Sequence, residues 1–330
     1  MMRRLAWLLV LVILTGIVVG ARWWYGTSSW AGQPQVLVIK QGASMGLVAD
    51  DLARQGFVKA PYLFAFVGRI TGADRGIRAG HYQIEQAMSP RALMRLLVSG
   101  DAYSYKVTLV EGKTFKELLV AIQAHPHVQS ELDGVNDAWI VNAFADFNGP
   151  EGWLFPDTYY FLADTTDKAL ILRSHQAMQS NLGQVWEARA EGLPIATSYE
   201  ALILASIIEK ETSLGAERAD IAGVFVRRLH KNMRLQTDPT IIYGLGERYH
   251  GDITRAHLRD KQNIYNTYQH GGLPPTPIAS PGRASLEAAV RPKGGTALYF
   301  VADGEGGHVF SDTLAEHERA VRAYLSKQKQ

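Results

Sequence analysis

An apolar run at the N-terminus, from Leu5 to Ala21, constrains the fold of this chain more than any other segment. Its length is close to the minimum of about 17–25 residues that a bilayer-spanning helix needs. Arg3 and Arg4 precede it, which favours a cytoplasmic position for that end, and the Arg-Trp-Trp-Tyr cluster at 22–25 suits the opposite interface. We therefore predict a cytoplasmic tip and transmembrane anchor over residues 1–25, with the rest of the chain exported.

A cleaved signal peptide is the alternative for this segment, because Val19-Gly20-Ala21 is an acceptable small-residue cleavage site. The apolar run is longer than the signal-peptide core of about 7–15 residues. We therefore favour a retained anchor, and both alternatives place the remaining residues outside the cytoplasm.

Composition excludes several functional classes. The 330 residues are enough for two or three domains. The absence of cysteine excludes thiolate zinc sites, iron–sulfur clusters, thiol nucleophiles and disulfides. A net charge of +2, without a dense Lys/Arg patch, argues against nucleic-acid binding. There is no zinc-hydrolase His-Glu-x-x-His motif, nucleophile elbow or phosphate loop, so we expect neither a metal nor a cofactor.

Patterning along the rest of the chain predicts two α+β parts joined to the anchor by a Ser/Gly-rich linker, residues 26–34. Residues 35–103 read as strand, helix, helix, strand and helix, a small module that loosely resembles the LysM-like subdomain of some cell-wall enzymes. A structural cap without a binding role is the alternative. Residues 104–330 form the larger part, which we predict to be helical up to Leu229 and loop-rich from there to a strand at 297–301.

Glu211 is the candidate catalytic residue. It lies on a predicted helix, 199–214, that opens with a capping box of Thr197 and Glu200. At helical spacing it shares a face with apolar residues, so its pKa should rise toward the range of a general acid. An ion pair with a Lys or Arg inside the fold is the alternative. Glu209 points about 200° away and is the second choice.

Three loop segments after this helix combine aromatic, amide and hydroxyl side chains with Pro and Gly. They are Met233–Thr240, Ile264–Tyr268 and Gly271–Pro275. Such surfaces suit sugars, whose rings stack on aromatic side chains and whose hydroxyls need donors and acceptors. The alternative is that Pro and Gly only shape turns. Because all three follow a candidate acid, we favour a sugar-binding groove.

Several long motifs together resemble the YceG-like (MltG) family of endolytic murein transglycosylases. The motifs are Ile207–Thr212, Leu235–Gly244, Tyr265–Tyr268, Gly272–Pro275 and Glu151–Tyr159, which occur in the family's order behind an N-terminal anchor. The resemblance covers essentially the whole chain. It implies a LysM-like subdomain followed by a YceG-like catalytic domain with a lysozyme-like active-site helix. It also implies a single-pass inner-membrane protein with its catalytic domain in the periplasm, working beside peptidoglycan synthases.

The activity implied by this resemblance is endolytic cleavage of the β-1,4 bond between N-acetylmuramic acid and N-acetylglucosamine, which leaves a 1,6-anhydromuramyl end. A Glu followed by Ser or Thr is similar to the catalytic pair of lysozyme-like transglycosylases, which matches Glu211-Thr212. The candidate sugar-binding residues are Gln236, Thr237, Asp238, Tyr243, Tyr265, Asn266, Tyr268, Leu273 and Pro274. The alternatives are a hydrolytic muramidase, in which Asp238 or Glu217 activates water, and a wall-binding scaffold without activity.

Overall fold

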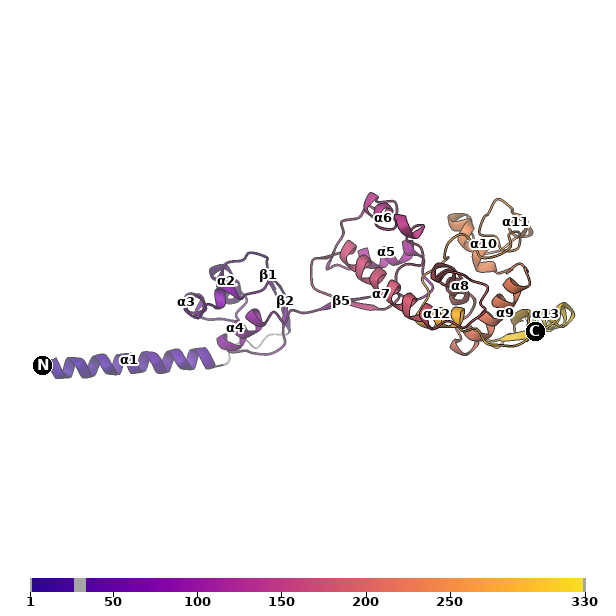
Figure 1. Ribbon diagram of the computed structural model, residues 1–330. Helices are drawn as coiled ribbons and strands as arrows, with labels where there is room; N and C mark the ends of the chain where they lie inside the picture. Colours follow the sequence, from indigo (N-terminus) through magenta and orange to yellow (C-terminus); the bar gives the residue numbers. More distant parts are fainter. Residues whose placement is uncertain (1, 27–33, 329–330) are drawn as a thin grey trace. The chain divides into compact units, whose positions relative to one another are not determined.

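The computed structural model describes residues 2–26 and 34–328, which divide into two compact units. The first comprises Met1–Tyr105 and Tyr160–Asp164, and the second comprises Lys106–Tyr159 and Thr165–Gln330. The boundary falls within two strands, β3 (Tyr105–Thr108) and β5 (Thr158–Phe161). Both units contain helices and strands, so the mixed α+β fold predicted from the sequence is confirmed (Figure 1).

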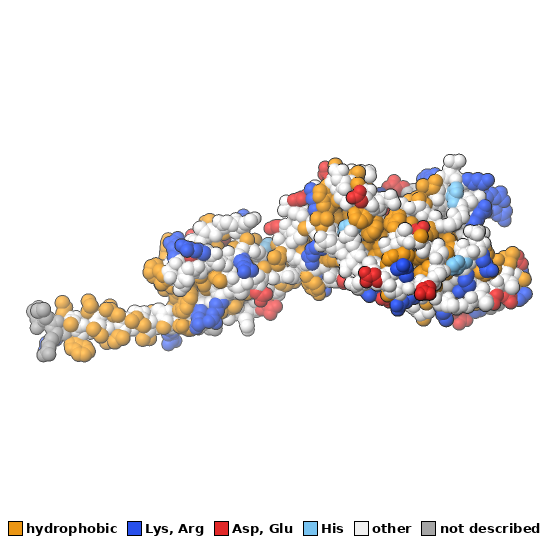
Figure 2. All heavy atoms as spheres, in the orientation of Figure 1, with side chains coloured by type: hydrophobic (Ala, Val, Ile, Leu, Met, Phe, Trp, Pro, Cys, Tyr) orange, Lys and Arg blue, Asp and Glu red, His pale blue; other side chains and the backbone are white. Residues whose placement is uncertain are grey.

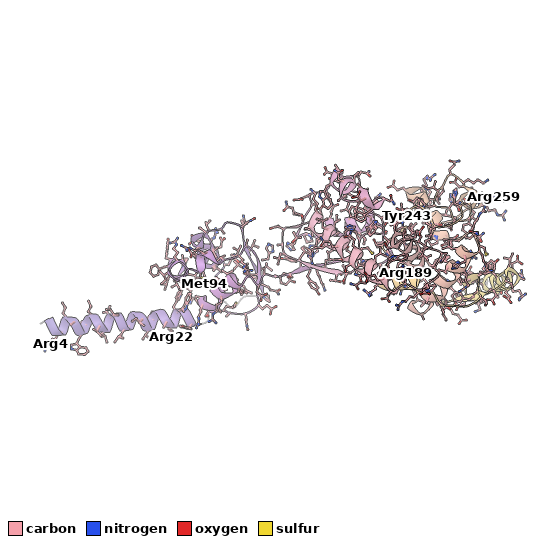
Figure 3. The ribbon with its side chains drawn as sticks, viewed as in Figure 1. Arg4, Arg22, Met94, Arg189, Tyr243 and Arg259 are labelled. Atoms are coloured by element: carbon pink, nitrogen blue, oxygen red, sulfur yellow. The ribbon has the colours of Figure 1, made fainter. Side chains whose placement is uncertain are left out.

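The N-terminal helix α1 (Met2–Tyr25) is long and apolar enough to cross a membrane. None of its apolar stretch is buried, and Arg4 and Arg22 lie near its two ends (Figure 3). The predicted apolar run therefore forms one continuous helix. Residues 27–33, most of the predicted linker, lie outside the described residues.

The N-terminal module, residues 34–104, is built on an antiparallel pair of strands. β1 (Gln35–Ile39) pairs with β2 (Gly80–Ile84), and Leu37 and Tyr82 face each other on the buried side. Helices α2 (Met45–Arg54) and α3 (Pro61–Ile70) connect the two strands, and α4 (Pro90–Ser99) follows them. The predicted order of elements is confirmed, and α4 ends at Gly100, whose φ of 72° suits glycine.

The second unit is mainly helical, and four of its helices pack around α8 (Ser198–Glu211). Its other elements are α5 (Phe115–Gln123), β4 (Val128–Gln129), α6 (Ala138–Ala143), β6 (Thr165–Thr166), α7 (Asp167–Glu187), α9 (Arg218–His230), α10 (Asp238–Leu245), α11 (Arg255–Arg259), α12 (Arg283–Val290), β7 (Tyr299–Ala302), β8 (His308–Ser311) and α13 (Leu314–Lys327). Helices α7, α9, α10 and α12 all contact α8 (Figure 1). The candidate acid is thus carried on the central helix of this unit.

Helix α8 begins with the predicted capping box, since Thr197 and Glu200 bond each other's backbone amides. The helix differs from the prediction in its burial and in its last residue. Every residue from Ala201 to Ile208 is buried, so the helix is enclosed on all sides instead of presenting one apolar face. It also ends at Glu211, three residues earlier than predicted, which places Glu211 at the terminus.

The segment between Leu229 and the strand at 297–301 is rich in loops, as expected, but it also contains helices α10, α11 and α12, which the sequence analysis did not predict. Two are only eight residues long and the third only five, so they carry too few turns for a clear hydrophobic period. Pro239, in the predicted loop segment Met233–Thr240, lies in the first turn of α10, where proline is well tolerated.

Candidate active site

Glu211 is the last residue of α8 and lies where the buried helix ends. The next residue, Thr212, leaves the helix in an extended conformation and is buried. From a segment 26 positions later, the Thr237 hydroxyl donates a hydrogen bond to Glu211 Oε1. The carboxyl group is therefore held both by its own helix and by the residue that precedes α10.

Burial raises the pKa of Glu211 from its ordinary 4.5 to about 7. The hydrogen bond from Thr237 opposes this rise because it favours the ionised carboxylate. The charge of Asp238 raises the pKa further, while His308 and Arg228 lower it. A carboxyl group with this pKa can be protonated or ionised at neutral pH, as a group that acts first as an acid and then as a base requires.

Glu209 is also buried, with its side chain 6% exposed, but it has a cationic partner. Arg218 Nη2 lies 3.4 Å from its Oε1, and the backbone N–H of Gly282 donates to its Oε2 at 3.0 Å. The ion pair considered above as the alternative for Glu211 therefore describes Glu209. Since Glu209 joins α8 to α9 and to the start of α12, we assign it a structural role.

Glu211 lines a first hollow of about 420 Å³, which we call the aromatic hollow. Residues from α9, from the segment before α10, from β7 and from α13 surround it. They are Arg228, Leu235, Gln236, Thr237, Asp238, Tyr268, Tyr299, Phe300, Leu314 and His317. Ring faces and planar polar groups are thus present together, as the sequence predicts for a sugar-binding surface.

Glu211 also lines a second hollow of about 610 Å³, which we call the charged hollow. Its other residues are Val110, Glu111, Gly112, Lys113, Glu209, Lys210, Thr212, Ser213 and Arg218. Burial and the nearby charge of Glu209 raise the pKa of Glu111, and Arg218 lowers it. The Glu211 carboxyl group lines both hollows. If one unit of a polymer occupied the aromatic hollow and the next unit occupied the charged hollow, the bond between the two units would lie at Glu211.

Arg228 stabilises the wall of the aromatic hollow from within α9. It is 6% exposed, and it donates from Nε to the Leu298 carbonyl at 2.6 Å and from Nη1 to the Leu235 carbonyl at 2.8 Å. Its guanidinium also lies 5.1 Å from the centroid of the Tyr299 ring. Arg228 therefore ties the strand β7 to the segment that carries Gln236 and Thr237.

Four of the predicted binding residues lie at or beside Glu211. Gln236, Thr237, Asp238 and Tyr268 all line the aromatic hollow. Gln236 has a left-handed backbone with φ 52°, an uncommon conformation for a residue other than glycine and a typical feature of constrained sites. The Tyr268 hydroxyl donates to Asp238 Oδ1 at 2.8 Å, which orients both side chains.

Asn266 lies outside both hollows and is fully buried. Its amide nitrogen donates to the carbonyls of His257 and Asp260 at 3.0 and 2.9 Å, and its Oδ1 accepts from the Tyr268 backbone at 3.0 Å. These bonds occupy the amide group within its own loop. The structure therefore gives Asn266 the role of holding the loop that presents Tyr268.

Tyr243 and Tyr265 belong to a network around another carboxyl group, Glu151. The Tyr243 hydroxyl donates to Glu151 Oε2 at 3.1 Å, and its ring packs edge-on against Tyr265 at 4.8 Å. Glu151 also accepts from the backbone N–H of Phe115 at 3.0 Å. Burial raises the pKa of Glu151 to about 7 despite these hydrogen bonds. Neither tyrosine lines the hollows at Glu211.

The remaining candidates are spread over the second unit. Leu273 is half-buried and Pro274 is buried, and neither lines the two hollows. Glu217, considered as a water-activating base, accepts from His308 Nδ1 at 2.7 Å and likewise lies outside both hollows. Among the residues that the structure describes, no group of three His, Asp or Glu side chains could hold a metal ion.

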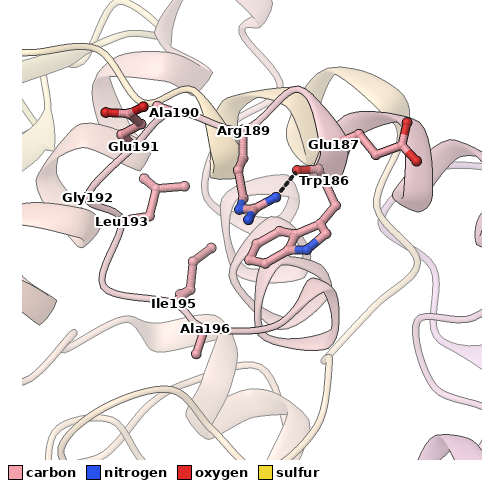
Figure 4. A pocket seen from close by; sticks show the side chains of 9 residues that line it. All are labelled: Trp186, Glu187, Arg189, Ala190, Glu191, Gly192, Leu193, Ile195 and Ala196. Carbon is pink, nitrogen blue, oxygen red and sulfur yellow. Dashed lines mark hydrogen bonds between the residues drawn. The ribbon is translucent and has the colours of Figure 1, made fainter.

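A separate hollow of about 440 Å³ lies at the end of α7 (Figure 4). The Arg189 guanidinium stacks on the Trp186 ring at 4.4 Å and donates from Nη1 to the Trp186 carbonyl at 2.9 Å. The carboxylates of Glu187 and Glu191 point away from the space between these side chains. This hollow therefore lacks the inward carboxyl group that distinguishes the site at Glu211.

Sequence reasoning missed Arg228, Tyr299 and Glu151 as parts of this region. One partner of Arg228, the Leu298 carbonyl beside β7, lies 70 positions later, which spacing along one helix cannot foresee. Glu151 opens the aromatic segment 151–159. A carboxyl group at the edge of so aromatic a segment is the signal that could have identified it, by the same reasoning that selected Glu211.

Comparison with known proteins gives one consistent result. The YceG-like family matches residues 37–323. The endolytic murein transglycosylase of Bacillus subtilis is 31% identical over 306 residues, which cover 87% of this chain and 84% of that protein. The endolytic murein transglycosylase of Streptococcus pneumoniae (strain D39) is 28% identical, and the aligned region covers 87% of this chain but only 58% of the longer streptococcal protein. A crystal structure of a YceG-like protein from Listeria monocytogenes matches 88% of this chain and 99% of its own, with 28% identity and a TM-score of 0.54.

Proposed function

Because this chain belongs to the YceG-like family, we propose that it is an endolytic murein transglycosylase with Glu211 as its catalytic acid and base. The observation that carries the assignment is a carboxyl group with a pKa of about 7 that lines two adjoining hollows. A glycan strand that lies across both hollows exposes one glycosidic bond to this group. The substrate bond is the β-1,4 bond between N-acetylmuramic acid and N-acetylglucosamine.

In the first step, protonated Glu211 donates its proton to the glycosidic oxygen as the bond from that oxygen to C1 of the muramic acid breaks. The N-acetylglucosamine leaves with a free 4-hydroxyl group, and C1 develops oxocarbenium character. The proton comes from a group whose pKa matches neutral pH, so the transfer is efficient. The Thr237 hydroxyl stabilises the carboxylate that remains.

In the second step, the Glu211 carboxylate accepts the proton of the C6 hydroxyl of the muramic acid. As this proton leaves, the C6 oxygen of the sugar forms the new bond to C1. The product is a 1,6-anhydromuramyl end, and Glu211 is protonated again. No water enters the reaction, and a second carboxylate is not required because the nucleophile belongs to the substrate. The intramolecular attack also gains from proximity.

We assign sugar contacts to the residues of the aromatic hollow that combine rings with polar groups. Tyr268 offers a ring face, and Gln236 and Asp238 offer hydrogen-bonding groups beside Glu211. The Tyr299 ring is stacked against His317 and contacted by Arg228, so it forms part of the wall. Tyr243 and Tyr265 act at a distance, through their hydrogen bonds to Glu151 and Thr276, and Asn266 holds the Tyr268 loop. Leu273 and Pro274 line neither hollow, so we assign them no sugar contact. Thr237 acts on the carboxyl group itself.

We further propose that α1 anchors the protein in the inner membrane with both units in the periplasm. Its length and apolar surface support the anchor, and the N-terminal arginines support the orientation. The strand–helix–helix–strand order of the N-terminal module supports a LysM-like subdomain over residues 35–103. From this position the enzyme would end the elongation of nascent strands beside the synthases.

Mass spectrometry of digested peptidoglycan tests the reaction. We expect internal fragments with anhydromuramyl ends from the native protein and none from the Glu211→Gln variant. Reducing ends would instead identify a hydrolytic muramidase, with Glu111 or Asp238 as the candidate base because both line the hollows at Glu211. Glycan binding without any product would identify a scaffold.

A further inference from the structure

Helix α3 carries an exposed apolar face on the surface of the N-terminal module. Tyr62, Phe66 and Ile70 are 89%, 57% and 66% exposed, and they follow one another at intervals of four residues. With Leu63, 39% exposed, they cover an arc of about 100° on one side of the helix, at about 100° per residue. We call these four residues the α3 stripe. Large neighbouring apolar side chains at such exposure mark an interaction surface.

The opposite side of α3 connects it to the end of the anchor. Phe64 is fully buried, and its ring lies 6.5 Å from the ring of Trp24 in the last turn of α1. The guanidinium of Arg91 in α4 lies 4.7 Å from the Tyr25 ring. Trp and Tyr at the end of a membrane-spanning helix occupy the headgroup level. Helix α3 is therefore within side-chain contact of residues at that level.

The basic side chains around the α3 stripe favour binding to an anionic surface. Lys59, Arg69 and Arg75 are exposed on or beside α3, where Asp74 is the nearest acid in the sequence. Residues 34–104 contain eight Lys and Arg against five Asp and Glu. An apolar helix face bordered by basic side chains is the pattern of helices that lie in the bilayer interface.

A glycan is a poorer occupant of this surface. Sugar hydroxyls require donors and acceptors in addition to ring faces, and only Tyr62 of the four stripe residues provides a polar group. Phe66, Ile70 and Leu63 provide none.

We propose that the α3 stripe inserts into the outer leaflet of the membrane, so that the N-terminal module lies on the lipid surface beside the anchor. This inference rests on the proposed anchoring by α1. The N-terminal module would then rest on the membrane surface. Lys59, Arg69 and Arg75 would bind the headgroups of anionic phospholipids.

A single fluorescent label on the full-length chain tests the proposal, because the sequence contains no cysteine of its own. The Phe66→Cys variant carries the label in the stripe. The Val38→Cys variant is the control, since Val38 is an apolar residue of β1 that is 44% exposed on the same module. The strands lie at the opposite end of the module from α3 (Figure 1). The hydrophobic side chains at the α3 edge are visible in Figure 2.

The labelled proteins are reconstituted in vesicles of phosphatidylethanolamine and phosphatidylglycerol, and flotation selects the inserted protein. We expect the label at position 66 to emit at shorter wavelength and to be quenched several-fold more by headgroup-proximal nitroxide lipids than the label at position 38. Adding Tyr62→Asp and Ile70→Asp to the Phe66→Cys variant should remove this difference, whereas Val36→Asp should preserve it. All of these positions are exposed, so we expect the fold to be retained, and circular dichroism of each variant checks this.

Two results would overturn the proposal while leaving the anchor intact. One is protein that floats with the vesicles but shows equal, water-like emission at positions 66 and 38. The other is a label at position 66 that is shielded from aqueous iodide without lipid quenching, which would assign the stripe to a second copy or to glycan. Protein that fails to float would overturn the proposed anchoring, and this inference with it.

Discussion

Two glutamates on the last turn of α8 show how neighbouring residues acquire different roles. Both are largely buried, yet Glu209 has Arg218 and the Gly282 amide as partners, while Glu211 has a neutral hydroxyl. A buried carboxyl group with a cation beside it is retained as an ion pair, whereas one without such a partner favours the protonated form. This difference between Glu209 and Glu211 depends on partners that are distant in sequence. Helix geometry alone therefore could not decide whether Glu211 is a catalytic acid or part of an internal ion pair.

The raised pKa of Glu211 predicts a dependence of stability on pH. Glu211 ionises near pH 4.5 in the unfolded chain and near 7 in the folded protein, so between these values the unfolded state binds fewer protons. The free energy of unfolding therefore falls as pH rises through this window. We expect Glu211→Gln to be more stable than the native protein above pH 7, by at most about 3 kcal/mol.

Denaturant unfolding at a series of pH values measures this difference. It should vanish below about pH 4.5, where Glu211 is protonated in both states. A variant that is equally destabilised at every pH would show that Glu211 contributes a structural charge.

The hydrogen bond from Thr237 to Glu211 leads to a separate prediction about catalysis. Its hydroxyl favours the ionised form of Glu211, so Thr237→Val should move the alkaline limb of the pH–rate profile of kcat/KM to higher pH. Loss of a hydrogen bond to a charged group should also lower kcat by about tenfold. Steady-state rates on glycan strands measure both effects. Thr158→Val, which removes a hydroxyl that bonds Thr108 away from both hollows, should behave like the native enzyme.

At the scale of elements, α10 links the catalytic carboxyl to a second carboxyl group. The residue before this helix, Thr237, bonds Glu211, and Tyr243 within the helix bonds Glu151. Glu151 in turn accepts from Phe115, the first residue of α5. The position of Thr237 therefore depends on a network that reaches across the second unit.

Substitution of Glu151 tests this network. We expect Glu151→Ala to lower the free energy of unfolding by about 1–3 kcal/mol, because it leaves the buried donors of Phe115 and Tyr243 without their acceptor. Glu151→Gln keeps an acceptor oxygen and should cost less. Activity should fall mainly in kcat, since Glu151 lies outside both hollows. Unchanged unfolding of the Ala variant would contradict this role.

The elements that the sequence predicted well have clear local signals. The anchor, the β-α-α-β module and α8 each have a long apolar pattern or a capping box, and all are present. The short helices α10, α11 and α12 lack a long apolar pattern, and the capping box of α11 uses His257 in place of the usual Glu or Gln, so all three were missed. Within the site, Glu211 and the segment 236–238 could be selected from side-chain chemistry. Arg228 and Tyr299 could not be selected in this way, because they contact each other from segments that are distant in sequence.

At the scale of the whole molecule, the division into two compact units predicts that the catalytic unit does not need the anchor for its chemistry. A chain that begins at Pro34 should cleave isolated glycan strands at a rate within a few-fold of the full-length enzyme. It should no longer float with vesicles. Product release from soluble strands measures the rate. A folded but inactive truncated protein would show that the anchor is required for the active conformation.

The identity of the catalytic carboxyl is the central claim, and the rate of anhydromuramyl-end formation by Glu211→Gln and Glu209→Gln tests it most directly. Rates are normalised to folded protein, because Glu209→Gln breaks an ion pair. We predict that Glu211→Gln loses about 10²–10⁴-fold in rate with unchanged glycan binding, while Glu209→Gln keeps its activity per folded molecule. Full activity of Glu211→Gln together with loss of activity in folded Glu209→Gln would contradict the account.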